Sequence, residues 1–225
     1  MWRGLSSVRD PIKWDAVLFD LDGTLADTTE LIMQAFRHTT LAHFGEEGSD
    51  DEWLALLGMP LRVQMRKFGR SDEEADAMVQ TYVSFQHTVH DEMVDTFPGV
   101  LDVVERLKSR GTRVAVVTSK ANKIAHRTLA CCGLGGVFET VVTVDDVAKG
   151  KPDPDPVHLA MARLGLDRPE GVVFLGDSPY DVMAGRAAGV FTAAALWGPF
   201  ERAKLQEVDP HFFLESPAEL LSLTP

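Results

Sequence analysis

Several acidic side chains of this 225-residue sequence stand directly after short apolar runs, where they could share a ligand. Asp20 and Asp22 follow the first run, and their two-residue spacing in an extended segment would point both carboxylates to the same side. Asp177 follows a later run, and Asp181 lies just beyond it. Clustered carboxylates repel one another unless a cation lies between them, and sets of oxygen ligands suit Mg²⁺. The pattern therefore predicts a divalent-cation site.

A lysine and two hydroxyl groups have comparable positions in the sequence. Lys151 lies in Gly150-Lys151-Pro152-Asp153-Pro154, and Thr118 and Ser119 follow the apolar residues 114–117. Ligands of open α/β sheets collect at the carboxyl ends of the strands, so these groups would meet the carboxylates at one edge of a sheet. Any single aspartate could instead only cap a turn or a helix, but that interpretation does not explain the whole set at successive strand ends.

Short continuous apolar runs bounded by turn residues are typical of strands that are buried on both faces of a parallel sheet. The expected strands cover residues 16–19, 114–117, 141–144 and 172–175, with weaker candidates at 193–196 and 212–214. Between them lie helical patterns that end before Gly111, Gly133 and Gly165. This alternation from about residue 98 onward predicts an α/β core with a doubly wound parallel sheet and right-handed crossovers.

The interval from residue 28 to about residue 97 breaks the alternation, because it shows helical periodicity and no convincing strand. Turn signals at Gly45, Gly58 and Gly69 divide it into three or four helices. We therefore predict a small all-helical cap domain, residues 28–95, inserted into an α/β core domain that is formed by residues 1–27 and 96–225.

Composition narrows the choice of partners and compartment. The formal net charge of −12 argues against nucleic acid or an anionic membrane as the main partner. Cys131 and Cys132 are adjacent and cannot form a normal bridge with each other, which suits a reducing cytoplasm. No stretch approaches the roughly 18 apolar residues that span a bilayer, and Met1–Trp14 contains no apolar run of signal-peptide length. We expect a soluble, cytoplasmic monomer or homodimer that acts on a small molecule.

The order of the motifs resembles that of the haloacid dehalogenase-like phosphatase superfamily. Asp20-Leu21-Asp22-Gly23-Thr24-Leu25 is similar to its first motif, and Thr118-Ser119 is similar to its second. Lys151 in Lys-Pro-Asp-Pro and Gly176-Asp177-Ser178-Pro179-Tyr180-Asp181 resemble the third and fourth. The match spans residue 16 to about residue 196, and the helical insertion lies where that family has its cap. The resemblance implies a Rossmann-like core and a Mg²⁺-dependent hydrolase of a small phosphorylated metabolite, in the phosphoglycolate phosphatase or inorganic pyrophosphatase branch.

The resemblance also implies roles for single residues. Asp20 would be the nucleophile that forms an aspartyl-phosphate. Asp22 would protonate the leaving oxygen and later take a proton from the attacking water. Mg²⁺ would be held by Asp20, the backbone carbonyl of Asp22 and Asp177, and would neutralise charge between the nucleophile and the phosphate. Lys151 would stabilise the transferring phosphoryl group, and Asp181 would hold Lys151 or a water on the ion in place.

The same resemblance predicts a set of phosphate-binding residues, namely Gly23, Thr24, Thr118, Ser119 and Lys151. Gly23 would let the backbone turn tightly enough for amide groups to face the phosphate. Arg62 and Lys120 are further candidates for a contact with the substrate. The competing interpretation of Arg62 is an ordinary surface arginine, and that of Lys120 is a solvated residue at the start of a helix.

Asp22 bears on the type of reaction, because the dehalogenase members of the superfamily lack this second aspartate. Its presence favours phosphoryl transfer over cleavage of a carbon–halogen bond. A sugar-phosphate mutase of the β-phosphoglucomutase type shares all four motifs and the helical cap, so it stays an alternative. A non-catalytic phospho-acceptor similar to response-regulator receivers is a second alternative. Receivers, however, have their acceptor after the third strand and lack a large insertion after the first.

Overall fold

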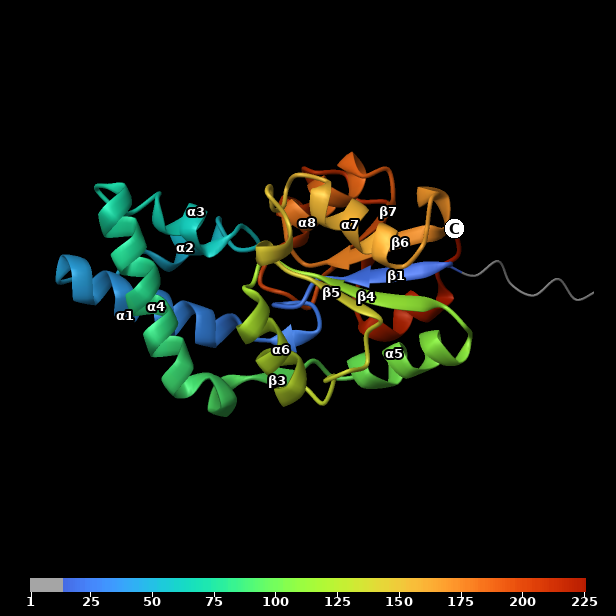
Figure 1. Ribbon diagram of the computed structural model, residues 1–225, viewed down its shortest axis with the longest axis horizontal. Coiled ribbons are helices and arrows are strands. Elements are labelled where there is room, and N and C mark those ends of the chain that lie inside the picture. Colours follow the sequence, from blue (N-terminus) through green and yellow to red (C-terminus); the bar gives the residue numbers. More distant parts are fainter. Residues whose placement is uncertain (1–13) are drawn as a thin grey trace, which may run out of the picture.

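The computed structural model describes residues 14–225, so the part of the predicted core domain at residues 1–13 lies outside the described residues. Within this range the main sheet has six parallel strands in the order β5-β4-β1-β6-β7-β8 (Figure 1). The strands are β1 Ala16–Phe19, β4 Arg113–Val117, β5 Thr140–Val142, β6 Val172–Gly176, β7 Phe191–Ala195 and β8 Phe212–Leu214. The predicted doubly wound parallel sheet is confirmed, and β1, the first strand within residues 14–225, lies inside it.

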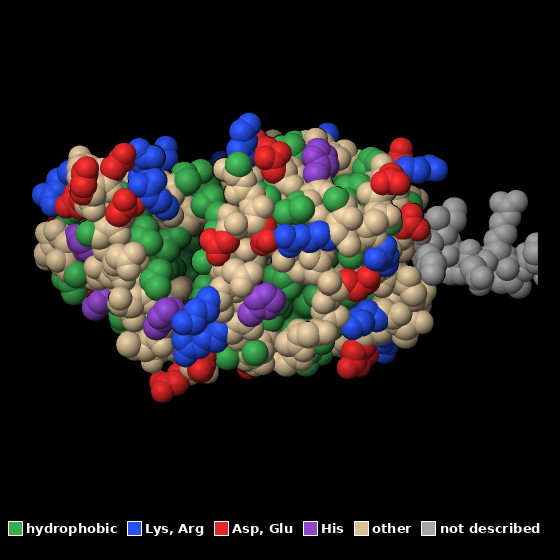
Figure 2. Space-filling view, viewed as in Figure 1, with side chains coloured by type: hydrophobic (Ala, Val, Ile, Leu, Met, Phe, Trp, Pro, Cys, Tyr) green, Lys and Arg blue, Asp and Glu red, His purple; other side chains and the backbone are tan. Residues whose placement is uncertain are grey.

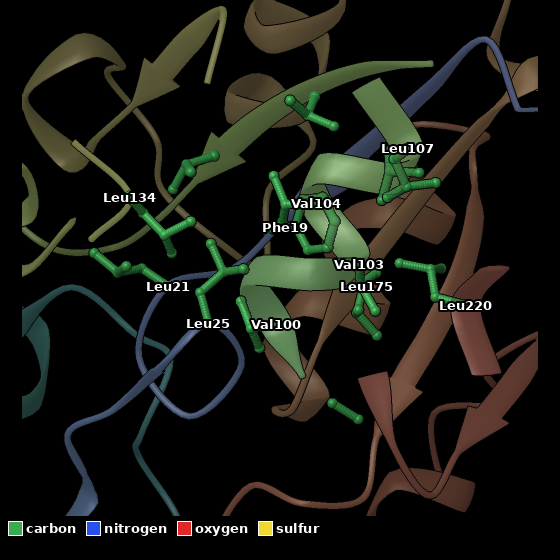
Figure 3. Packing of buried hydrophobic residues seen from close by; sticks show 14 of the residues in the cluster. Phe19, Leu21, Leu25, Val100, Val103, Val104, Leu107, Leu134, Leu175 and Leu220 are labelled. Atoms are coloured by element: carbon green, nitrogen blue, oxygen red, sulfur yellow. The ribbon is translucent and has the colours of Figure 1, made fainter. Parts of the chain in front are cut away.

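Helices cover both faces of this sheet, which explains why its strands are mostly apolar. They include α5 Val100–Ser109, α6 Asn122–Cys131, α7 Asp155–Arg163, α8 Pro179–Ala187 and the short α9 Arg202–Gln206. Alternate residues of β1 enter opposite cores, because Phe19 packs into the cluster that contains α5 whereas Leu18 packs into the cluster that contains α7. Figure 3 shows the first cluster, with α5 lying against Phe19 and Leu175. No helix in the described part of the chain is both long and apolar enough to span a membrane.

The third expected strand is shorter than its apolar pattern suggested. β5 ends at Val142, and Val144–Asp146 form a 3₁₀ turn. The cause is local, because the Asp146 carboxylate accepts hydrogen bonds from both the backbone N–H (2.8 Å) and the hydroxyl (2.7 Å) of Thr143. The prediction of a strand through residue 144 was wrong for this reason. The turn brings Val144 to the wall of the cavity that is described below.

The interval between β1 and α5 is mainly helical, as predicted, and its helices form a lobe beside the sheet (Figure 1). This helical lobe consists of α1 Thr29–Phe44, α2 Asp50–Leu54, α3 Leu61–Met65 and α4 Asp72–Met93. Its helices share an apolar cluster in which the rings of Phe36 and Trp53 stack with their centroids 4.3 Å apart. The boundaries of the proposed cap domain, residues 28–95, stay a prediction.

A short antiparallel pair that the sequence pattern did not predict lies at the base of the helical lobe. β2 Ala26–Asp27 pairs with β3 Asp95–Thr96. Two-residue strands are too short to show the alternation by which longer strands are predicted. The pair joins the two segments that connect the lobe to the sheet, so the lobe is attached close to the carboxyl end of β1.

Candidate active site

The carboxyl ends of neighbouring strands bring the predicted chemistry to one place. Asp20 follows β1, Thr118 follows β4 on one side of it, and Asp177 follows β6 on the other. A cavity of about 260 Å³ lies between these strand ends and the helical lobe, where Figure 2 shows a hollow lined by hydrophobic side chains. The predicted site residues that line it are Asp20, Asp22, Gly23, Arg62, Thr118, Ser119, Lys120, Lys151 and Asp177.

Lys151 forms buried ion pairs with two carboxylates. Its Nζ lies 2.7 Å from Oδ1 of Asp20 and 2.5 Å from Oδ1 of Asp181, and the three side chains are at most 5% exposed. Burial by itself lowers the pKa of Lys151, but the two neighbouring carboxylates raise it above its ordinary value. Lys151 therefore stays protonated beside Asp20, where it could also hold the oxygens of an anion.

Burial acts in the other direction on the carboxylates of the site. It raises the pKa of Asp20 to about 7, and the negative charge of Asp181 adds to the shift. Burial likewise raises the pKa of Asp177 well above its ordinary range, with contributions from the charges of Asp181 and Asp20. Both groups are thus disfavoured as anions when no cation other than Lys151 is near them, and a divalent cation would favour the charged forms.

The arrangement of these carboxylates fits a divalent cation. Oxygens of Asp20, Asp177 and Asp181 lie within 4.8 Å of one another. Oδ1 of Asp177 accepts a hydrogen bond of 2.9 Å from the Thr24 hydroxyl, and a Cβ on Gly23, whose φ is +80°, would lie only 2.4 Å from Oδ2. Glycine at position 23 therefore keeps the space beside Oδ2 open, and an oxygen-only donor set of this kind suits Mg²⁺.

Asp181 differs from the other members of this group because both of its oxygens already have protein partners. Oδ1 accepts from Lys151, while Oδ2 accepts from the backbone N–H (3.0 Å) and the hydroxyl (2.6 Å) of Ser178 at the start of α8. This geometry agrees with the predicted role of Asp181 in holding Lys151. It leaves Asp20 and Asp177 as the side chains with more freedom to bind an ion.

Asp22 lies at the same strand end as Asp20 but has different neighbours. Its Oδ1 accepts a hydrogen bond of 2.7 Å from the Thr28 hydroxyl, which directly precedes α1, and forms a close ion pair with Nζ of Lys120. The side chain of Lys120 is only 8% exposed. The interpretation of Lys120 as a solvated helix-start residue was therefore wrong, because its charge is buried against a carboxylate that lies on another strand end.

The predicted phosphate-binding hydroxyls have unequal positions. Thr118 lines the cavity, and its Oγ1 accepts a hydrogen bond of 3.1 Å from the backbone N–H of Lys120. The Ser119 hydroxyl donates to the carbonyl of Gly58 in the helical lobe at 2.6 Å. The Thr24 hydroxyl donates to Asp177, and Thr24 is not among the residues that line this cavity in the described chain. Direct contacts of Ser119 and Thr24 with phosphate stay predictions, since both hydroxyls have other partners here.

Arg62 lines the cavity, but its charge is already paired. The guanidinium donates to Asp76 at 2.5 and 3.0 Å, and both side chains are 53% exposed. The predicted contact of Arg62 with a substrate anion stays a prediction. It would require the guanidinium to leave or share Asp76.

Sequence reasoning missed polar residues of the helical lobe that line the same cavity. Tyr82 and Gln86 lie one turn apart on α4, are at most 5% exposed, and form a hydrogen bond of 3.3 Å from Gln86 Nε2 to Tyr82 Oη. Gln64 of α3 is also buried at the cavity wall. A glutamine within the apolar stripe of α4 was the available signal, because a polar residue on a buried helix face needs a partner.

The raised pKa of Asp20 predicts a pH-dependent difference between the wild type and Asp20→Asn without metal. An aspartate whose pKa is raised by folding stabilises the protein fully below its unfolded pKa of about 4, and this contribution is lost as pH rises through about 7. Partial desolvation lowers the pKa values of the buried His90 and the exposed His211, and both groups act in the opposite direction but are common to both proteins. In EDTA, the melting temperature of Asp20→Asn relative to wild type should therefore rise between pH 5.5 and pH 8. A constant or falling difference would contradict the assignment.

Comparisons with known proteins agree with this geometry. A family model described as haloacid dehalogenase-like hydrolase matches residues 17–195. The chain is 39% identical over 209 residues to pyrophosphatase PpaX from Bacillus velezensis, covering 93% of this chain and 95% of that protein. The crystal structure of a putative haloacid dehalogenase-like hydrolase from Bacteroides fragilis is similar with a TM-score of 0.86 and 25% identity, covering 92% and 100% of the two chains. A putative phosphoglycolate phosphatase from Lactobacillus plantarum is similar with a TM-score of 0.83 and 25% identity, covering 94% and 99%.

Proposed function

Because this chain belongs to the haloacid dehalogenase-like hydrolase family and is a phosphatase of that family, we propose that it cleaves its substrate through an aspartyl-phosphate on Asp20 with Mg²⁺ as cofactor. The observation that carries the proposal is the buried pairing of Asp20 with Lys151 at the cavity. This pairing supports the proposal because the proposed nucleophile would then have a cation for the phosphoryl oxygens beside it. Membership of this hydrolase family also disfavours the receiver-like phospho-acceptor.

The first half of the reaction forms the covalent intermediate. Lys151 occupies Oδ1 of Asp20, while Oδ2 has no hydrogen-bond partner among residues 14–225. Oδ2 would attack phosphorus, and the bond from phosphorus to the leaving oxygen would break. Asp22, two residues further along the chain, would give a proton to that oxygen as general acid. Lys151 and the Thr118 hydroxyl would hold the oxygens of the phosphoryl group in flight.

The second half regenerates Asp20. Asp22, now ionised, would take a proton from a water molecule as that water attacks phosphorus, and the bond from phosphorus to Oδ2 of Asp20 would break. Inorganic phosphate would leave. Lys120 and Thr28 hold the Asp22 carboxylate in one orientation, so the same group can serve both halves of the reaction.

The cation would be held by the Asp20 and Asp177 carboxylates together with the backbone carbonyl of Asp22. When bound, Mg²⁺ supplies positive charge that lowers the repulsion between a carboxylate and an anionic phosphate. The protein itself would keep the Asp20 and Asp177 carboxylates close together in a buried site. Gly23 and the Thr24 hydroxyl do this for Asp177.

Removal of divalent cations should abolish phosphate release. We expect activity to be lost in excess EDTA and to return on addition of Mg²⁺, whereas Ca²⁺ should inhibit because its looser coordination does not keep the groups in line. The measurement is the rate of phosphate release at a fixed substrate concentration and constant ionic strength. Full activity after exhaustive chelation would contradict the proposed cofactor.

Pyrophosphate is the first candidate substrate, because the relative that shares 39% identity with this chain is named a pyrophosphatase. Small phosphomonoesters such as phosphoglycolate are the second, on the likeness to the Lactobacillus plantarum protein. A screen of phosphate esters together with pyrophosphate, read as released phosphate, would decide between them. Glucose 1-phosphate belongs in the screen, because a mutase would convert it to glucose 6-phosphate rather than to free phosphate.

A further inference from the structure

We propose that Lys120 selects substrates whose leaving group carries a negative charge. This inference rests on the proposed phosphatase function and adds to it the chemical class of the group that leaves. The leaving group of such a substrate contains an anion, which could be the second phosphate of pyrophosphate or a carboxylate of an organic phosphate ester.

The first argument is the state of the Lys120 ammonium group. Its side chain is 8% exposed and belongs to the lining of the cavity, so its charge has little contact with solvent. An ammonium group carries three N–H donors, and Asp22 is the one acceptor that Nζ has among residues 14–225. A buried charge with unused donors is costly, and an anion in the cavity would use them.

The second argument is the position of Lys120 relative to the proposed reaction. Lys151 contacts Asp20, the proposed nucleophile, whereas Lys120 contacts Asp22, the proposed donor of a proton to the leaving oxygen. The two buried lysines therefore mark opposite ends of the bond that breaks. An anion attached to the leaving oxygen would lie on the side of Lys120. Arg62, the other cation of the lining, is instead paired with Asp76 and half-exposed.

The backbone of Lys120 is fixed, which favours a positioned charge over a mobile one. Its N–H donates to Oγ1 of Thr118 at 3.1 Å, and its carbonyl accepts from the N–H of Val144 at 3.3 Å. Both partners line the same cavity. The ammonium group thus enters the site from a point that is anchored to the ends of β4 and β5.

Tyr82 adds a second donor in the same cavity. Its hydroxyl accepts from Gln86, and its own proton has no acceptor within the described part of the chain. Ile32, Val79 and Val83 of the lobe line the cavity with apolar side chains, beside the polar Gln64 and Gln86. In such surroundings an interaction between a lysine and an anion is stronger than in water. Lys120 and Tyr82 could together bind the oxygens of an anionic leaving group.

The test compares substrates that differ in this charge. Phosphoglycolate carries a carboxylate where 2-hydroxyethyl phosphate has a neutral hydroxyl, and pyrophosphate carries a phosphate. We expect Lys120→Met to lower kcat/KM for at least one anionic substrate by roughly 10- to 100-fold more than for 2-hydroxyethyl phosphate. Lys120→Arg, which keeps the charge, should retain most of the preference. Lys123→Met, on the exposed face of α6, is the matched control and should behave as wild type.

The three substrates show whether the anion that Lys120 binds is a phosphate or a carboxylate. A selective loss for pyrophosphate alone identifies a phosphate, and a selective loss for phosphoglycolate alone identifies a carboxylate. An equal loss for all three substrates in Lys120→Met, with a folded protein by circular dichroism, would overturn the proposal, because Lys120 would then only hold Asp22. Normal activity of that variant on all three would overturn it too. Failure of the proposed phosphatase function is a different result, namely phosphate release by Asp20→Asn equal to that of wild type.

Discussion

Asp20→Asn is expected to lower phosphate release by at least about four orders of magnitude while the protein stays folded. The amide that replaces the carboxylate has a similar shape but is not a nucleophile. Folding should survive because burial already disfavours the ionised form of Asp20, as its raised pKa indicates. The measurement is kcat with the best substrate of the screen and Mg²⁺, together with the melting temperature of the purified variant.

The matched control for this experiment is Asp167→Asn, since Asp167 is exposed and lies outside the cavity lining. It makes the same chemical change without touching the site and should keep wild-type activity. If Asp20→Asn retained even a tenth of the wild-type rate, the assignment of the nucleophile would be wrong.

Lys151→Met is expected to damage both activity and stability. It removes the cation between Asp20 and Asp181, which are at most 5% exposed, and leaves these carboxylates without their partner. Breaking a buried ion pair from one side costs about 3–5 kcal/mol of unfolding free energy. Activity should fall by about a thousandfold or more, because the same ammonium group is proposed to hold the phosphoryl oxygens. Urea unfolding in EDTA and kcat with Mg²⁺ measure the two effects.

Two further proteins make this result interpretable. Lys149→Met changes a lysine that is 72% exposed close to Lys151 in the chain, and its stability should match that of wild type. The double variant Asp20→Asn/Lys151→Met should be more stable than Lys151→Met alone. A neutral amide then replaces one of the two buried carboxylates, Asp20 and Asp181, that lost their ion-pair partner. A loss below about 1 kcal/mol in Lys151→Met would show that the buried pairs contribute no more than surface pairs do.

Sequence patterns predicted that the motif residues lie together, because their placement follows from topology. Asp20, Thr118 and Asp177 each end an apolar strand, and parallel neighbouring strands bring their carboxyl ends to one edge. Local patterns are sufficient for such a prediction. The cluster formed by the carboxylates and Lys151 could be predicted without knowing how the side chains pack.

The parts that the sequence did not predict depend on contacts between distant segments or on very short ones. Lys120 is next to Asp22 only because β1 and β4 are neighbours, and the two residues are 98 positions apart in the chain. Tyr82 and Gln86 line the cavity because α4 lies across from the sheet edge, which helical periodicity alone does not reveal. The 3₁₀ turn at Val144 resulted from one side-chain hydrogen-bond pair that outcompeted an apolar strand pattern.

The central claim is that phosphate is transferred to the side chain of Asp20, and an acid quench during turnover tests it most directly. Wild-type protein that is mixed with substrate and Mg²⁺, denatured in acid and digested should yield a peptide that contains Asp20 and carries one added phosphoryl group. Quenched Asp20→Asn should lack it. A phosphoryl group found only on another residue would contradict the account. The account would also be contradicted if no peptide carried a phosphoryl group although the best substrate was turned over and the phosphate transfer to the protein was fast.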